Sequence, residues 1–450
     1  MEKVAGLDTF RVISERVGRF NVQGKTFLIP EMNRIGCHLL AGVFRGFGIN
    51  SKVMETYEGL DLGKEFTSGK ECFPCVVTLG DILQFMKKER ERLGNRFDPE
   101  NYMYFMPESD GPCRFGMYNK YHRIILDSFP GLDRVKIASL SSEDAYSLDG
   151  LIPKEKMQNF RKAAYLSVVV GDIIDRLLWR IRPYEREEGE ADKFINEAME
   201  RVTESFSKNS SEKNLSIILD DLVEIVKQGK EIIDPNIPKK PLIGVIGEIY
   251  VRTHVKSNQD TIRTLEKYGA EAINASIAEW VNYTAYDQVR LAKIALRLNL
   301  KRFQLKEIKE AILRYLKYNL NLFYQYMQQR KAYKMVRNYI DIEEDHKIGH
   351  LEKVLKKDNT FSFEVGTEAC LSISSALEYG RRGYNGIVNI FPFTCMPSNL
   401  TSAITKPLMA KLNTPYIDIS YDGSFQPGRE AALRTFMYQA YQHFKTHGKP

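Results

Sequence analysis

The chain lacks several features that would assign it to a familiar class. It has 450 residues and no run of about twenty apolar residues, so we expect no membrane-spanning helix. Its first twenty residues contain no apolar segment typical of a secretory signal, and we expect a cytoplasmic protein. It has no GxxxxGK[ST] loop, zinc finger, aromatic RNA-binding motif, internal repeat or low-complexity tract. We therefore expect no ATP site and no binding of nucleic acid.

Charge is nearly balanced over the whole chain but not along it. There are 65 Lys and Arg against 58 Asp and Glu, with 43% hydrophobic and 27% charged residues, as in an ordinary globular protein. Residues 301–340, however, hold ten Lys or Arg and only two Glu. A basic helical face of this kind predicts a solvated surface, a docking surface for an anionic partner, or a contact for cofactor phosphates.

The length exceeds what one hydrophobic core normally serves, so we expect two or three domains. Residues 1–150 alternate between compact apolar runs and amphipathic segments, which predicts a Rossmann-like α/β domain with a parallel sheet. The expected strands are 25–32, 51–57, 101–108 and 134–140. The expected helices are 37–48, 75–94 and 117–129.

The remainder predicts a helical subdomain at 151–235 and a second Rossmann-like α/β domain at 236–450. Apolar residues recur at helical spacing over 154–230, and a segment with three prolines, 233–241, resembles a linker. The second domain carries a long helical insertion at about 283–340. Its expected strands are 242–251, 270–277, 386–393 and 415–421, and its expected helices are 258–269, 399–412 and 429–444.

Cysteine is scarce, and its placement is informative. The chain has six cysteines and no visible signal sequence, which argues against a disulfide framework and favours metal binding, catalysis or burial. Cys72, Cys113 and Cys395 share a setting, because each lies in a loop with glycine or proline that precedes a predicted helix. Cys113 and Cys395 also follow a predicted strand, whereas no strand directly precedes Cys72.

This setting has a chemical reason. Ligands of open α/β sheets bind beyond the carboxyl ends of the strands, where helices begin. Helix N-termini offer free N–H groups and partial positive charge, which stabilise the thiolate that ligates metal. Three cysteines on separate loops can converge on one [4Fe–4S] cluster and leave one iron open to a substrate or water. Convergence is a hypothesis that spacing alone does not prove.

Other uses of the cysteines remain open from the residues alone. Cys72 and Cys75 form a CxxC pair that is compatible with a redox dithiol or with half of a structural zinc site. Heme attachment would need histidine where Val76 stands. Plain burial is favoured for Cys37 and Cys370, which lie on apolar helical segments, and it is as good an explanation as a ligand role for Cys75.

The cysteine segments together resemble a known family. They are "TSGKECFPCVVTLGDIL", "FMPESDGPCRFGMYNKYHRIILD" and "GIVNIFPFTCMPSNLTSAI", accompanied by "GVIGEIYVR", by Glu279 and Trp280, and by "PYIDISYDGS". The set resembles the 2-hydroxyacyl-CoA dehydratase superfamily over residues 25–445. The nearest branch is related to the C-terminal regions of large acyl-CoA dehydratase activase-type proteins.

The resemblance implies an iron–sulfur enzyme, a lyase or oxidoreductase, with the cluster between its Rossmann-like domains. By position, Cys72, Cys113 and Cys395 match the cluster ligands of the family. The resemblance also implies oxygen sensitivity and a separate ATP-hydrolysing iron–sulfur activator that delivers single low-potential electrons. It further implies a radical dehydration or reduction of an acyl-CoA-type substrate, and a homodimer or a heterodimer with a related subunit.

Two alternatives to this interpretation use the cysteines differently. A double-cubane [8Fe–9S] reductase of small molecules takes six thiolates, and would require Cys75, Cys37 and Cys370 in addition. A non-catalytic electron carrier would use four protein thiolates and leave no iron open.

A few polar residues near the cysteines complete the candidate site. Glu248, Arg252 and Asn258 follow a predicted strand. Glu248 is a candidate proton donor or substrate anchor, although a salt-bridged loop is the favoured explanation of this segment. Ser109 flanks Cys113 and is the third catalytic candidate, beside Glu248 and Arg252. The other neighbours that can hydrogen-bond the cluster or substrate are Asp110, Gly111 and Arg114. His122 is expected to be an ordinary helix or core residue, and "YDGS" at 421–424 either lines the same crevice or forms a turn.

Overall fold

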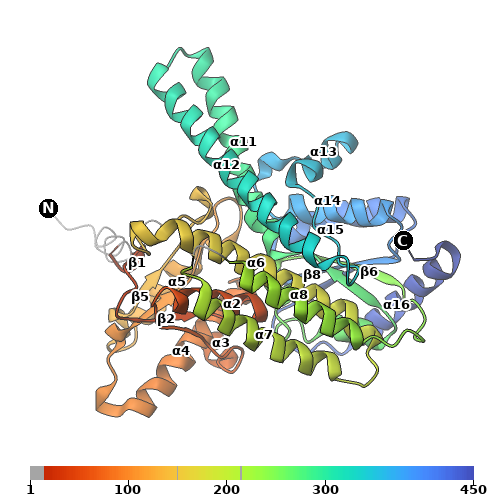
Figure 1. The fold of residues 1–450 in the computed structure, drawn as a ribbon, viewed down its shortest axis with the longest axis horizontal. Helices are drawn as coiled ribbons and strands as arrows, with labels where there is room; N and C mark the ends of the chain where they lie inside the picture. The colour runs from red at the N-terminus through yellow and green to blue at the C-terminus, as the bar shows by residue number, and fades with distance from the viewer. Residues whose placement is uncertain (1–14, 149, 213–214, 450) are drawn as a thin grey trace.

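The computed structural model describes residues 15–148, 150–212 and 215–449; residues 1–14, part of the stretch searched for a secretory signal, lie outside this range. The fold is α/β, as predicted, with two parallel sheets and a set of long helices (Figure 1). No helix in the described part of the chain has both the length and the apolar character needed to cross a bilayer.

The N-terminal sheet has the strand order β1-β5-β4-β2-β3, and all its pairings are parallel. Its strands are β1 (Val17–Gly18), β2 (Thr26–Ile29), β3 (Ser51–Val53), β4 (Tyr102–Phe105) and β5 (Lys136–Ala138). Its helices are α2 (Arg34–Gly46), α3 (Leu60–Glu65), α4 (Phe73–Leu93) and α5 (Tyr118–Asp127). Both faces are covered: Phe27 and Ile29 of β2 pack toward α2, and Leu28 packs toward α4 and α5. Because both faces of the sheet are buried, successive residues of β2 are all apolar.

Three long helices form a layer beside this sheet, here called the helical layer: α6 (Lys154–Ile181), α7 (Glu190–Asn209) and α8 (Ser216–Glu231). The layer meets α2 through glycines. A Cβ atom at Gly42 would lie 2.5 Å from the carbonyl oxygen of Thr203 on α7, and one at Gly46 would lie 2.8 Å from that of Phe206. The two helix backbones therefore approach each other as closely as glycine allows.

The C-terminal sheet has the order β7-β6-β8-β9, again entirely parallel. Its strands are β6 (Leu242–Gly247), β7 (Glu271–Asn274), β8 (Gly386–Pro392) and β9 (Tyr416–Tyr421). Its helices are α9 (Ile249–Thr253), α10 (Thr261–Lys267), α11 (Ile277–Lys301), α12 (Leu305–Val336), α13 (Ile348–Asp358), α14 (Ala369–Arg381), α15 (Met396–Lys411) and α16 (Gly428–His447). Every residue of β6 and β8 is buried, because helices cover both faces.

The two sheets share one topology. Leaving β1 aside, the N-terminal sheet runs β3-β2-β4-β5 and the C-terminal sheet β7-β6-β8-β9, so each has the order second, first, third, fourth along the chain. The strand order reverses between β2 and β4 in one sheet and between β6 and β8 in the other. In open α/β sheets this reversal creates a crevice beyond the carboxyl ends of the strands, where ligands bind.

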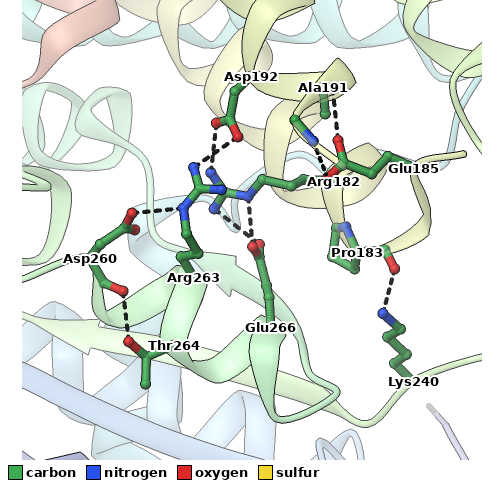
Figure 2. Close-up of polar contacts among 11 residues, drawn as sticks. Arg182, Pro183, Glu185, Ala191, Asp192, Lys240, Asp260, Arg263, Thr264 and Glu266 are labelled. Carbon is green, nitrogen blue, oxygen red and sulfur yellow. Dashed lines mark hydrogen bonds and ion pairs between the residues drawn. The ribbon is translucent and has the colours of Figure 1, made fainter. Parts of the chain in front are cut away.

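The helical layer meets the C-terminal sheet through ion pairs (Figure 2). Arg182, at the end of α6, pairs with Glu266 of α10 at 2.6 Å and with Asp192 of α7 at 3.1 Å. Arg263 of α10 also pairs with Asp192, at 2.8 Å. The Nζ atom of Lys240 donates to the carbonyl oxygen of Pro183. These polar contacts add to an apolar one, because Trp179 of α6 packs in the core of the C-terminal sheet.

Helices α11 and α12 form an antiparallel hairpin that projects from the body of the molecule (Figure 1). The hairpin contains most of the basic segment 301–340. Its tip also exposes large apolar side chains, with Phe303 at 87% and Leu305 at 81% of their full accessibility. Apolar and cationic groups therefore share the same protruding surface.

Several expected boundaries are wrong, each for a local reason. The strand expected at 242–251 ends at Gly247, whose φ of +117° leaves the strand conformation, and the carboxylate of Glu248 then caps α9. The strand expected at 270–277 ends at Asn274, so the helical insertion begins at Ile277 instead of 283. The helix expected from 399 begins at Met396, with Cys395 as its N-cap. The short elements β1 and α3 were not expected.

Candidate functional site

A cavity of about 860 Å³ lies where the carboxyl ends of both sheets meet. Its walls come from the segments after β2, β4, β6 and β8, and from α6 and α12. The residues that matter for its chemistry are Cys72, Cys113, Cys395, Cys37, Ser109, Glu248 and Glu368. Both reversal points of strand order therefore open into one cavity, which is the place where an α/β fold binds ligands.

The three predicted ligand cysteines all line this cavity, and each is the residue directly before a helix. Cys72 is the N-cap of α4 and Cys395 is the N-cap of α15. Cys113 precedes a 3₁₀ turn, Arg114–Met117, that leads into α5. The expected local setting is confirmed at all three positions. Cys72 follows α3 and not a strand, in agreement with the sequence, which predicted no strand directly before it.

Helix starts around the cavity differ in whether a side chain caps them. At three of them the N-cap side chain accepts a backbone N–H: Asn33 from Gly36, Glu248 from Tyr250 and Val251, and Ser276 from Glu279. Where cysteine is the N-cap, no side chain caps the helix. The cysteine-led starts thus keep their partial positive charge for a ligand of the cavity.

Arg114 connects the loops of all three cysteines. It follows Cys113, and its guanidinium donates to the carbonyl oxygen of Lys70 at 2.5 Å and to that of Thr394 at 2.8 Å. Lys70 lies two residues before Cys72, and Thr394 directly precedes Cys395. One planar group with several N–H donors therefore fixes three loops relative to one another.

The backbone beside two of the cysteines is constrained. Thr394 has a φ of +61°, an unfavourable conformation for a β-branched residue, which costs on the order of 1–3 kcal/mol. Gly111 has a φ of +85°, and a Cβ there would lie 2.7 Å from the carbonyl oxygen of Gly366, just before α14. The loop of Cys113 is thereby pressed against the segment that carries Glu368. Strain of this kind is concentrated at functional sites.

Acidic groups crowd the cavity. Burial raises the pKa of Cys72 to about 12 and that of Cys113 to about 11, and burial also raises the pKa of Cys395. Burial, followed by the negative charge of Glu248, raises the pKa of Glu368 to about 8. These groups also raise one another's pKa, because each ionised member repels the next. A cation placed among them would relieve that repulsion and convert the thiols to thiolates.

The spacing of the sulfur atoms distinguishes between kinds of metal site. A single zinc ion, with Zn–S bonds of about 2.3 Å, cannot hold sulfurs more than about 4.6 Å apart. The sulfurs of Cys72, Cys113 and Cys395 do not all lie within 4.8 Å of one another. The three thiols, as they are placed, therefore do not form a site for a single zinc ion.

The other three cysteines lie apart from this set to different degrees. Cys37 lines the cavity on α2, and its thiol donates to the carbonyl oxygen of Pro30 at 3.3 Å. Cys75 faces the core between α4 and α5, with its sulfur 3.5 Å from Nε2 of His122. Cys370 is buried in the core around α13 and α14. Cys75 and Cys370 are not among the residues that line the cavity.

Among the predicted catalytic and anchoring residues, Glu248 and Ser109 line the cavity, whereas Arg252 and Asn258 lie behind it. Glu248 lines the cavity, and its carboxylate accepts N–H groups from Tyr250 at 3.0 Å and Val251 at 2.8 Å. Ser109 lines the cavity beside Cys113, whose pKa is raised chiefly by burial and is lowered in part by a hydrogen bond from the Ser109 side chain. Arg252 and Asn258 are buried behind α9, where Arg252 donates to the carbonyl oxygen of Gly247.

The remaining candidates have structural explanations. His122 is a core residue, and burial lowers its pKa to about 4. Asp110 lines the cavity and accepts from Ser141 at 3.3 Å. In "YDGS" the backbone N–H of Ser424 donates to Asp422, so the segment is a turn, and Gly423 packs on Phe73 at the start of α4.

Glu368 was missed from the sequence. It is the N-cap of α14, it lines the cavity, and its Oε1 atom is buried without a hydrogen-bond partner among the described residues. The sequence feature that could have indicated it is Gly366, which predicts a turn followed by a helix. It does not predict that this helix starts at the cavity. Pro74 and Pro397 carry a clearer unused signal, because Cys-x-Pro occurs at both cysteine-led α-helices.

A comparison with models of protein families and with curated proteins finds no match to this chain. The function is therefore inferred from the sequence motifs and from the geometry of the cavity.

Proposed function

We propose that this chain is an iron–sulfur enzyme of the 2-hydroxyacyl-CoA dehydratase type, with a [4Fe–4S] cluster held by Cys72, Cys113 and Cys395. The observation that carries the proposal is the convergence of three cysteine-led, uncapped helix starts, from both sheets, on one cavity. A bound cluster would supply one-electron chemistry and, at its iron without a protein thiolate, a Lewis acid for a carbonyl oxygen.

The protein's own side chains would position the cysteine loops and supply a proton to the substrate. Arg114 holds the three loops at fixed spacing. Glu368, with a pKa of about 8, keeps its proton at neutral pH and faces the cavity, so it is the better proton donor for a departing hydroxyl. Glu248 is held by two N–H groups as a helix cap and serves to orient. The buried charge of Arg252 lowers the pKa of both carboxyl groups.

The shape of the cavity supports an acyl-CoA-type substrate. From the cysteines the cavity extends along α6 and α12, and much of its wall is apolar, with Phe160, Val168 and Tyr324 as examples. Besides Arg114, the cations Lys154, Arg161, Lys162 and Lys317 also line it. A ligand with an apolar arm and a phosphorylated end matches this division.

A separate ATP-hydrolysing activator is the proposed electron source, because the chain has no phosphate-binding loop of its own. We assign its docking to the projecting α11–α12 hairpin, where exposed apolar residues lie among the basic ones. Partners that deliver electrons need accessible and electrostatically complementary surfaces.

The test is the content of iron and acid-labile sulfide per chain after anaerobic purification. We expect about four of each. Cys72→Ala, Cys113→Ala and Cys395→Ala should each lose most of the iron. The matched control is Cys75→Ala, which alters the same turn of α4 but removes a sulfur that faces the core. Cys370→Ala is a second control in the other domain.

Each alternative has its own result. About eight irons, lowered also by Cys75→Ala and Cys370→Ala, would indicate the double-cubane protein. Four irons whose retention also depends on Cys37, with no activator-driven turnover of any acyl-CoA, would indicate an electron carrier. Absence of iron under strict anaerobiosis would refute the proposal.

A further inference from the structure

A second group of possible metal ligands lies away from the cysteines. His346 precedes α13, His350 lies in the first turn of α13, and Glu378 lies on α14, which packs against α13. One ligand atom from each residue lies within 4.8 Å of the others. Among the described residues, this is the one set of three histidine, cysteine or carboxylate donors so close together.

The distances fit a shared metal ion better than a set of hydrogen bonds. Nε2 of His350 lies 3.2 Å, and Nε2 of His346 lies 3.7 Å, from the same Oε2 atom of Glu378. The second distance is too long for a hydrogen bond. Metal–ligand bonds of 2.0–2.2 Å at tetrahedral angles place two donor atoms about 3.4 Å apart. The two observed distances lie on either side of that value.

The surroundings leave the three donors available. Their side chains keep 37%, 48% and 15% of full accessibility for His346, His350 and Glu378, so an ion can enter and water can complete its shell. Arg382, about one turn beyond Glu378 at the end of α14, is paired with Glu343 at 2.5 Å. Its charge is therefore compensated, and it repels an incoming ion less than a free arginine would.

We propose that His346, His350 and Glu378 bind one divalent transition-metal ion of the Zn²⁺ class, with water as the fourth ligand. Two imidazoles and one carboxylate are a known donor set for zinc, and imidazole disfavours Mg²⁺ and Ca²⁺. The ion would tie the start of α13 to α14.

The location gives the site a structural consequence. Glu368 begins α14 at the cysteine cavity, and Glu378 lies ten residues further along the same helix. At 1.5 Å per residue the two ends are about 15 Å apart. A metal at Glu378 would restrain the helix whose other end presents Glu368 to the cavity.

The test is a titration of the full-length protein with Co²⁺, followed by absorption spectroscopy, and with Zn²⁺, followed by calorimetry. We expect one equivalent of Co²⁺ with the visible bands of a four-coordinate nitrogen and oxygen site and without sulfur-to-cobalt charge transfer. His346→Ala, His350→Ala and Glu378→Gln should each weaken metal binding at least about tenfold. Even the loss of a residue that only hydrogen-bonds to a metal ligand typically weakens binding by about this factor. Excess Mg²⁺ or Ca²⁺ should not compete.

The matched control is His443→Ala on α16. His443 and His447 are stacked at 4.2 Å, but no third donor within the same reach completes a set among the described residues. Binding should be unchanged in this variant. Cobalt bound with sulfur charge transfer and retained in all three ligand variants would overturn the proposal, as would no binding.

This inference stands apart from the proposed enzyme activity. The three ligand variants should keep the iron and sulfide content of the unmodified protein. A chain that holds no iron but still binds zinc through these residues would refute the cluster and support this site.

Discussion

The two sheets have the same strand order, and their helix starts can be compared position by position. Here the strands of each sheet are counted along the chain, without β1. After the first strand, which is β2 or β6, Asn33 and Glu248 both cap their helices. After the third, Cys113 and Cys395 both leave theirs uncapped. After the second, the sheets differ: α3 intervenes in the N-terminal half and Cys72 then leaves α4 uncapped, whereas Ser276 caps α11 directly after β7.

That one difference makes the site asymmetric. The N-terminal half lines the cavity with the thiols of Cys37, Cys72 and Cys113, and the C-terminal half lines it with the thiol of Cys395 and the carboxyl groups of Glu248 and Glu368. In the proposed cluster, the three thiolates at helix starts would leave one iron free for a ligand from outside the protein.

The sheets also differ in how they meet the helical layer. The N-terminal sheet does so through close glycine contacts between α2 and α7, and the C-terminal sheet through the buried ion pair between Arg182 and Glu266. Close apolar packing depends on shape, and a buried ion pair depends on both charges being present. The two contacts should therefore fail in different ways.

The largest effect is expected at the ionic contact. Arg182→Met leaves the carboxylate of Glu266 buried without its main partner, since both side chains are at most 8% accessible. We expect the free energy of unfolding to fall by about 3–5 kcal/mol. Urea unfolding followed by the fluorescence of the two tryptophans, Trp179 and Trp280, measures it.

A double variant separates lost charge from lost packing. Adding Glu266→Leu to Arg182→Met removes the stranded charge and should restore most of the stability. Lys267 lies on α10 beside Glu266 and forms an exposed pair with Glu430 of α16. Lys267→Met breaks only this exposed pair and should leave the unfolding midpoint unchanged. Equal losses in the single and double variants would show that the contact is held by packing alone.

The next largest effect is expected at the glycine contact. Gly42→Ala places a methyl group 2.5 Å from a backbone oxygen of α7, so the helices must move apart, at a cost of about 1–3 kcal/mol. Gly428→Ala on α16 is the control, because nothing lies within 4 Å of its new methyl group. Loss of stability at Gly428 but not at Gly42 would contradict the proposed role of close approach.

Much of the fold could be predicted because parallel strands covered on both faces are continuous apolar runs. The segments around β6 and β8 are of this kind, and both were located from the sequence. A strand as short as β1, two residues long, carries no such pattern. The end of β6 was misplaced because Ile249 and Val251 continue the apolar run after the backbone has turned at Gly247.

The site was predictable only where chemistry and local structure coincide. Proline and glycine around Cys72, Cys113 and Cys395 indicated helix starts, and the structure has them there. Whether Cys72 or Cys75 faces the cavity depends on the rotation of α4, which the sequence does not determine. Glu368 lies at the cavity where the loop of Cys113 packs against Gly366, and the sequence does not predict such a contact between distant segments.

The smallest and most specific effect is expected at Arg114, which joins the two half-sites. Arg114→Gln cannot span both carbonyl oxygens, so the loops of Cys72 and Cys395 should separate more easily. If the cluster is present, we expect its iron to pass to a chelator several-fold faster, with nearly the same unfolding midpoint. Arg114→Lys, which keeps the charge and one contact, should lie between.

Arg90→Gln gives the matched control, because Arg90 also donates to a backbone oxygen, that of Pro130 at 2.9 Å, but does not line the cavity. Its release rate should equal that of the unmodified protein. If both variants release iron equally fast, Arg114 stabilises the fold and does not position the loops. A faster release confined to Arg114→Gln would mean that the asymmetric half-sites depend on one side chain to act together.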